Sequence, residues 1–160
     1  MLLEIYPYRF FFQKLFCKYY YSSTYSYIDS KIKPKSYDFA YGDPIVIPLL
    51  STENIEFISH GCQYTRTQKT LKVSENSLSY KYLDVCIDGN FVKKSNTFLN
   101  CSTCWKCLRT LTTLDYYKKL HHYKNVFDLK KYYIKKDEFL QTLNKNDPLQ
   151  REIIELYKTK

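Results

Sequence analysis

Four cysteines within 22 positions are the residues of this sequence best suited to chemistry. They follow the pattern C-x14-C-x2-C-x2-C, at Cys86, Cys101, Cys104 and Cys107. Four cysteine thiolates match the tetrahedral, closed ligand shell of structural zinc, which leaves no position for water or substrate. An iron–sulfur cluster uses the same ligands and stays an alternative. The spacing therefore predicts a metal site, with zinc favoured.

Two elements must bring these thiols together. The alternating, β-rich residues 82–87 predict a strand that carries Cys86. Apolar residues at helical spacing predict a long helix from Cys104 to about residue 119, with Cys104 and Cys107 one turn apart near the positive end of its dipole. His60, His121 and His122 are alternative ligands, although the last two fit a helix C-terminus better.

The net charge of +9 admits two explanations. A basic protein suits nucleic acid, and nucleic acid or a protein partner stays possible. The explanation that we favour here is compositional, because only four basic residues are Arg and the rest are Lys in a Tyr-, Ile- and Asn-rich background. In such a background an Arg inside a motif suggests that its planar guanidinium group is needed, which draws attention to Arg66 and Arg109.

The length of 160 residues suits one domain. An expected helix over residues 2–16 and strand over residues 17–21 suggest an α/β unit, with Ser22 and Ser23 in the loop at the strand's carboxyl end, where open α/β sheets bind ligands. Asp43 lies in a predicted irregular connection over residues 29–48. The other predicted helices cover residues 49–60, 65–75, 136–144 and 148–158, and Arg66 and Lys69 share one face of the second of them.

Other signatures are missing from the sequence. It has no Walker A, dinucleotide-binding, G-x-S-x-G or H-E-x-x-H motif, and only three Gly. No run of about 18 apolar residues and no cleavable signal peptide is found. We therefore expect a cytoplasmic protein with no membrane partner and with reduced thiols. Cys17 and Cys62 lie outside the cysteine pattern, and we expect Cys17 in the core.

Three blocks resemble a known family. They are Pro-Leu-Leu-Ser-Thr-Glu at residues 48–53, Thr-Arg-Thr-Gln-Lys at residues 65–69 and Asn-Cys-Ser-Thr-Cys-Trp-Lys-Cys-Leu-Arg-Thr at residues 100–110. Together with Cys86 they resemble the C-terminal half of 7-cyano-7-deazaguanine synthase and similar PP-loop ATP pyrophosphatases, in which four cysteines bind a structural zinc. A closer resemblance is to uncharacterised bacterial PP-loop-like proteins, whose blocks read P-L-W-S-T-E, T-R-x-E-K and N-C-G-x-C-E-K-C-L-R-T.

The resemblance implies an α/β fold, namely the C-terminal part of an adenine nucleotide alpha hydrolase-like (HUP) fold with a four-cysteine zinc knuckle and a helical tail. It implies a partial PP-loop-like domain over residues 1–127, with the knuckle at residues 86–107, and a helical extension over residues 128–160. The phosphate-gripping S-G-G-x-D-S block is not in the sequence, so ATP and Mg²⁺ are expected only if a PP-loop is supplied upstream or by a partner.

On this reading the chain is a fragment or degenerate relative of an ATP-dependent adenylating ligase, and whether it is an enzyme stays open. The expected partners are the missing PP-loop segment or further copies of the chain. Ser22, Ser23, Asp43, Arg66, Lys69 and Arg109 are candidate substrate or phosphate contacts. The alternatives are a non-catalytic zinc module that binds RNA or a protein, and an iron–sulfur protein of sulfur transfer.

Overall fold

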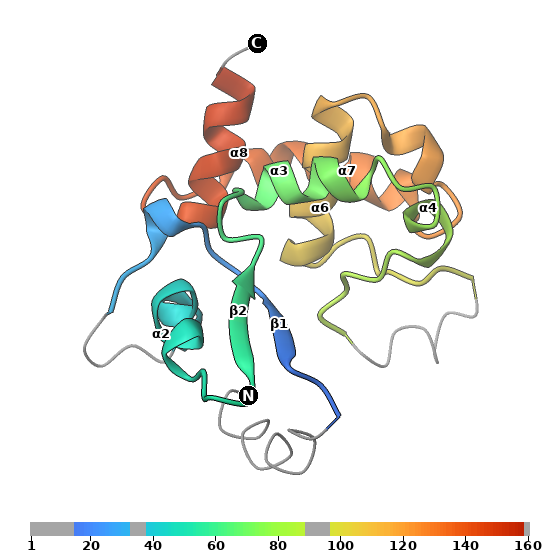
Figure 1. Ribbon diagram of the computed structural model, residues 1–160. Coiled ribbons are helices and arrows are strands. Elements are labelled where there is room, and N and C mark those ends of the chain that lie inside the picture. Colours follow the sequence, from blue (N-terminus) through green and yellow to red (C-terminus); the bar gives the residue numbers. More distant parts are fainter. Residues whose placement is uncertain (1–14, 33–37, 89–96, 159–160) are drawn as a thin grey trace. The chain divides into compact units, whose positions relative to one another are not determined.

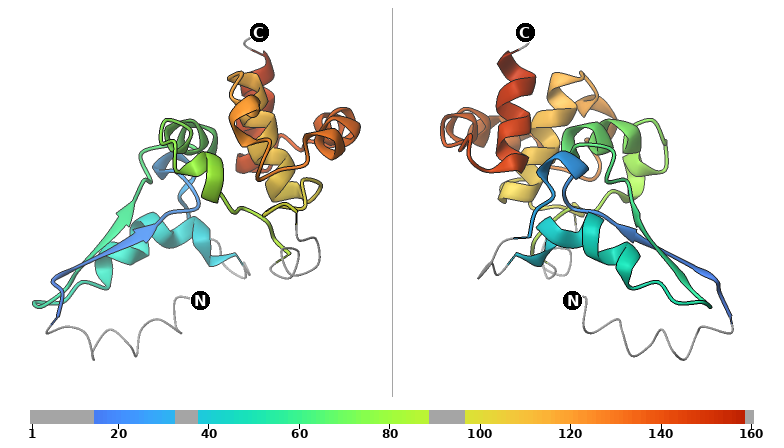
Figure 2. Two further views of the ribbon diagram at one scale, coloured as in Figure 1. Left: turned by 90° about the vertical axis from the view of Figure 1, so that its right-hand side faces the viewer. Right: turned by 60° about the vertical axis from the view of Figure 1, so that its left-hand side comes forward.

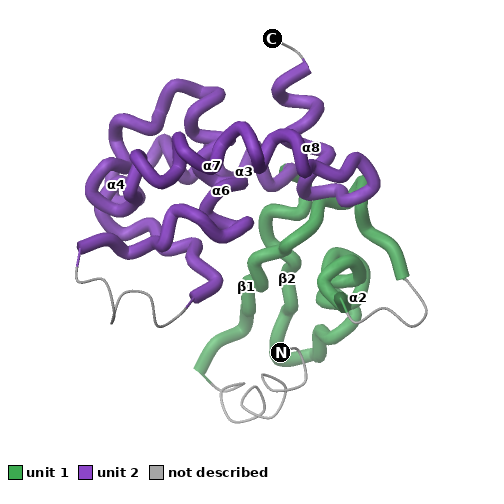
Figure 3. The backbone as a smooth tube through the Cα atoms, turned by 180° about the vertical axis from the view of Figure 1, so that it is seen from behind, with its two compact units in different colours: residues 1–64 green, residues 65–160 purple. Residues whose placement is uncertain are grey.

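The computed structural model describes residues 15–32, 38–88 and 97–158. The chain divides into two compact units, unit 1 with residues 1–64 and unit 2 with residues 65–160 (Figure 3). The class is mixed α/β, with six α-helices and one two-stranded parallel sheet in the described ranges. The boundary expected after residue 127 stays a prediction, and the helix expected over residues 2–16 falls almost wholly outside the described residues.

Unit 1 is built on the parallel strands β1 (Lys18–Ser22) and β2 (Glu56–His60). The register pairs Tyr19 with Phe57 and places their rings 5.6 Å apart. Helix α2 (Asp43–Leu49) lies along this face, where Ile47 packs against Phe57 (Figure 2). Parallel strands need a long crossover connection, and α2 lies within it.

Two predictions for unit 1 are wrong. The helix predicted over residues 49–60 is absent, since Leu49 ends α2 and the following residues lead into β2. The connection expected to be irregular contains α2, the 3-10 helix η2 (Phe39–Gly42) and the last residue of the 3-10 helix η1 (Tyr27–Asp29). Ser51 resembles a helix cap in sequence, but its hydroxyl accepts a hydrogen bond from the backbone N–H of Phe57 at 2.9 Å. Every second residue of this segment, namely Ile55, Phe57 and Ser59, is buried, which is typical of a strand with one face toward the core.

Unit 2 is helical and is organised around α6 (Trp105–Tyr116). Leu111 and Leu114 of α6 are buried in a core with Tyr123, Phe127 and Tyr132. Helices α3, α7 and α8 all pack against α6 (Figure 1). The other elements of unit 2 are α3 (Arg66–Val73), α4 (Ser79–Tyr82), η3 (Leu120–Tyr123), α7 (Leu129–Gln141) and α8 (Pro148–Lys158).

The helices predicted over residues 65–75 and 148–158 are confirmed as α3 and α8. Thr65 begins α3 with a reciprocal capping box to Gln68, and Pro148 stands in the first turn of α8. Helix α7 begins earlier than the expected residue 136, since Asp128 accepts hydrogen bonds from the N–H groups of Lys130 and Lys131. None of the helices within the described ranges is both long and apolar enough to cross a membrane.

Candidate metal centre

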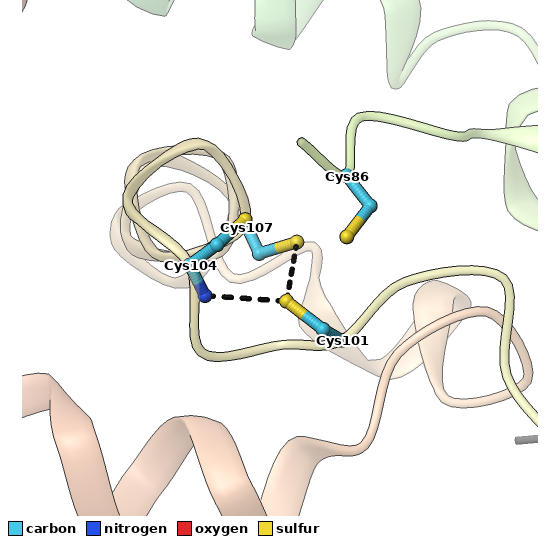
Figure 4. Close-up of side chains that lie close together, drawn as sticks. All are labelled: Cys86, Cys101, Cys104 and Cys107. Carbon is cyan, nitrogen blue, oxygen red and sulfur yellow. Dashed lines mark hydrogen bonds between the residues drawn. The ribbon is translucent and has the colours of Figure 1, made fainter. Parts of the chain in front are cut away.

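The four cysteines of the pattern converge on one point. The Sγ atoms of Cys86, Cys101, Cys104 and Cys107 all lie within 4.8 Å of one another, and the side chains point toward a common centre (Figure 4). The Sγ atoms of Cys101 and Cys107 are 3.8 Å apart. A tetrahedron of thiolates around zinc, with Zn–S bonds of about 2.3 Å, requires S···S distances of about 3.8 Å. The donor set therefore fits zinc with only a small contraction.

Helix α6 delivers two of the ligands. Cys104 is its N-cap residue and Cys107 lies in its first turn. Cys101 comes from the preceding loop, which turns sharply because Ser102 adopts a positive φ of 66°. This turn lets the backbone N–H of Cys104 donate to the Sγ of Cys101 at 3.3 Å. Thiolates at this position also face the positive end of the helix dipole, which stabilises negative charge.

Asn100 holds the segment that carries Cys86. Its Oδ1 accepts from the N–H of Val85 at 2.8 Å, and its Nδ2 donates to the carbonyls of Leu83 at 2.8 Å and Val126 at 3.1 Å. The strand expected over residues 82–87 is thus wrong, because a fully buried side chain, not a neighbouring strand, satisfies this backbone. Sequence reasoning missed the role of Asn100, although it directly precedes Cys101.

Ser102 is a second residue that sequence reasoning missed. It is fully buried, and its hydroxyl accepts a hydrogen bond from the backbone N–H of Asp128 at 2.8 Å. The turn at Ser102 is thereby joined to the start of α7. A glycine at this position would have signalled the positive φ in the sequence, whereas a serine gives no such signal.

The ionisation of the thiols differs within the cluster. Burial raises the pKa of Cys101, but hydrogen bonds from the N–H groups of Thr103 and Cys104 outweigh it and bring the pKa to about 6. Burial is the main cause that raises the pKa of Cys107 and of Cys86. Without a cation these two thiols hold their protons at neutral pH. A metal ion that binds all four sulfurs must therefore displace protons.

The histidines are not part of this cluster. Among the residues that the structure describes, the four cysteines are the one group of three or more metal-ligating side chains. His60 lies on β2, and His121 and His122 lie on η3. Cys62 is buried, whereas Cys17 is exposed, so the expectation that Cys17 lies in the core is wrong.

Three of the predicted substrate contacts belong to unit 1. Ser22 ends β1 and is exposed, while Ser23 is buried and its hydroxyl donates to the carbonyl of Tyr25. Asp43 is 1% exposed, and its carboxylate faces the hydroxyl of Tyr21 without a well-formed hydrogen bond. Burial raises the pKa of Asp43 to about 6, although the hydroxyl of Tyr21 opposes this shift. Their contact with a substrate stays a prediction.

The other three belong to unit 2. Arg66 begins α3 and Lys69 follows one turn later, while Arg109 of α6 is 8% exposed and lies 4.6 Å from the ring centroid of Trp105. The buried carboxylate of Glu152, on α8, accepts from the N–H of Thr67 at 2.9 Å. An N–H group that an external phosphate would use at the start of α3 is thus already bonded within the chain. The predicted phosphate contacts stay predictions.

Comparison with known proteins adds no relative from which a role could be transferred. No protein-family model matches the chain, and no curated protein or solved structure shows significant similarity to it.

Proposed function

We propose that Cys86, Cys101, Cys104 and Cys107 bind one structural zinc ion in unit 2. The observation that carries this proposal is the convergence of four sulfurs from two separate segments within 4.8 Å. Zinc would join the segment after α4 to the first turn of α6. Because the core of unit 2 is organised around α6, fixing the start of this helix stabilises the whole unit.

A structural role fits the ligand set better than a catalytic one. Catalytic zinc keeps a position open for water or substrate, whereas four thiolates close the ligand shell. Apparent binding free energies of structural zinc are about 10–16 kcal/mol in zinc-finger peptides, so loss of the ion would remove much of the stability of unit 2. We therefore expect unit 2 to fold in a zinc-dependent way.

Chelation of the reduced, purified chain tests the proposal. Removal of zinc is expected to lower the helical signal in circular dichroism, and stoichiometric zinc is expected to restore it. Co²⁺ in place of zinc is expected to give the strong visible absorption of a tetrahedral thiolate complex. Iron with a brown colour after anaerobic purification would instead support the iron–sulfur alternative. Unchanged helicity after complete metal removal would contradict the structural role.

We further propose that the chain is the zinc-bearing C-terminal portion of a PP-loop, ATP-dependent ligase-like protein and is inactive alone. The order of the three sequence blocks supports this, and so does the parallel pair β1 and β2 with α2 in the connection, an arrangement typical of α/β folds. The test is pyrophosphate release from ATP and Mg²⁺. We expect none from this chain alone, and activity when a polypeptide with S-G-G-x-D-S encoded upstream is co-expressed. If no such polypeptide restores activity, this wider proposal fails while the zinc site stands.

A further inference from the structure

The net positive charge of the protein resides in one unit. Residues 65–160 carry 19 Lys and Arg against 10 Asp and Glu, whereas residues 1–64 carry six of each. The whole net charge of +9 therefore belongs to unit 2. A compositional drift toward Lys would affect both units alike, so this asymmetry argues for a binding function of the basic unit.

Part of this charge gathers where α4 packs against η3. The rings of Tyr80 and His122 stack at 4.3 Å, and the hydroxyls of Ser79 and Tyr123 are 2.7 Å apart. Residues 116–127 contain three lysines and two histidines but no acidic residue. We call the following residues of α4, of η3 and of the turns beside η3 the lysine patch: Lys81, Tyr82, Lys118, Lys119, His121 and Lys124.

The lysines of the patch lack acidic partners. Lys72, Lys131, Lys135 and Lys136 form ion pairs with nearby carboxylates, but no ion pair involves the four patch lysines within the described part of the chain. Burial lowers the pKa of His122, and the neighbouring His121 and Lys119 lower it further. Cations that repel one another in this way favour an external anion.

Lys118 occupies a backbone position that normally takes glycine. Its φ is 57°, and it ends α6 in a Schellman motif. In this motif the N–H of Lys119 donates to the carbonyl of Leu114 at 2.8 Å, and the N–H of Lys118 donates to the carbonyl of Asp115 at 2.9 Å. A side chain at positive φ strains the backbone. A lysine at this position is therefore less favourable for folding than glycine would be.

We propose that the lysine patch binds single-stranded nucleic acid. The four lysines would contact consecutive phosphates, and exposed rings would stack on unpaired bases. Tyr82 is 61% exposed and lies beside the ammonium group of Lys81, and His121 is exposed as well. Interleaved rings and cations suit a flexible strand with exposed bases better than they suit an acidic peptide, which offers charge without π faces. This inference goes beyond the proposed zinc role and does not depend on ATP chemistry.

Fluorescence anisotropy with labelled 20-nucleotide single-stranded RNA and DNA of mixed sequence tests the inference on the zinc-loaded full chain. Four phosphate contacts predict a slope of about −3 for log K against log salt concentration. The triple change Lys118→Gln, Lys119→Gln and Lys124→Gln is expected to weaken binding at 50 mM salt about 100-fold and to bring the slope close to −1. Zinc content and circular dichroism of each sample show whether weaker binding comes from removal of the lysines or from unfolding of the variant.

A matched control removes the same charge elsewhere in unit 2. The triple change Lys72→Gln, Lys135→Gln and Lys158→Gln affects exposed lysines of α3, α7 and α8, and we expect binding to weaken by less than about fivefold. The single change Lys118→Gly gives a second test, in which stability and binding are expected to change in opposite directions. It is expected to raise the melting temperature because it relieves the positive φ, and to weaken binding several-fold.

Three results would overturn the inference. They are no binding of either strand at 50 mM salt, equal losses in the two triple variants, and binding of poly-glutamate or of phosphatidylserine vesicles as strong as that of the single strands. In each case the zinc proposal is judged separately, from the metal content of the same samples.

Discussion

Asn100 makes the sharpest test of how the metal centre is held. Replacement by alanine removes three side-chain hydrogen bonds, which leaves the N–H of Val85 and the carbonyl of Leu83 without this partner. At about 1 kcal/mol for each bond, Asn100→Ala is expected to lower the free energy of unfolding by about 3 kcal/mol. For a unit of this size the melting temperature falls by about 15 °C.

The assay is urea unfolding of the zinc-loaded chain, followed by circular dichroism, with the midpoint and slope fitted together. Asn100→Asp is expected to destabilise at least as much, since a carboxylate places an acceptor against the carbonyls of Leu83 and Val126. Asn125→Ala, at an exposed position of the same unit, serves as the control and is expected to change stability by less than about 0.5 kcal/mol. A loss below about 1 kcal/mol for Asn100→Ala would refute the reasoning.

Three further changes test other contacts by urea unfolding. Ser102→Gly is expected to be more stable than Ser102→Ala by about 1 kcal/mol, because both lose the bond from Asp128 but only glycine relieves the positive φ; equal stabilities would contradict this. Asp43→Asn is expected to stabilise the protein at pH 8 by about 1–3 kcal/mol and to have little effect at pH 4. The pKa of Asp43 in the folded chain, about 6, lies above its ordinary value of 3.8, so the native chain loses stability as the pH rises from about 4 to about 6. A variant less stable than the native chain at pH 8 would show that the Asp43 carboxylate has a stabilising partner. Glu152→Ala is expected to cost about 2 kcal/mol because it orphans the buried N–H of Thr67, whereas Glu152→Gln keeps an acceptor and costs less; equal losses would point to the charge instead.

The four-cysteine cluster was the most predictable part of the fold. Its members follow a local spacing, and Cys104 and Cys107 lie at the start of a helix whose apolar periodicity is plain in the sequence. The proline at position 148 was also sufficient to predict the start of α8. These signals act within a few residues, so one sequence contains all of the information that they need.

The wrong predictions concern segments whose partners are distant in sequence. Residues 82–87 have the alternation of a strand, but their backbone bonds to Asn100, about 15 positions away. Residues 49–60 carry the signals of a helix start at Ser51, but pairing with β1 makes their second half a strand. Local propensity is a weak guide where tertiary hydrogen bonds compete with it.

Native mass spectrometry of the reduced, full-length chain tests the central claim most directly. The expected result is one zinc ion per chain, lost when Cys86, Cys101, Cys104 or Cys107 is changed singly to Ser and kept when the exposed Cys17 is changed in the same way. A metal-free folded chain would contradict the account, and so would zinc retained by the Cys86→Ser variant, since Cys86 is the one cysteine that its segment supplies to the cluster.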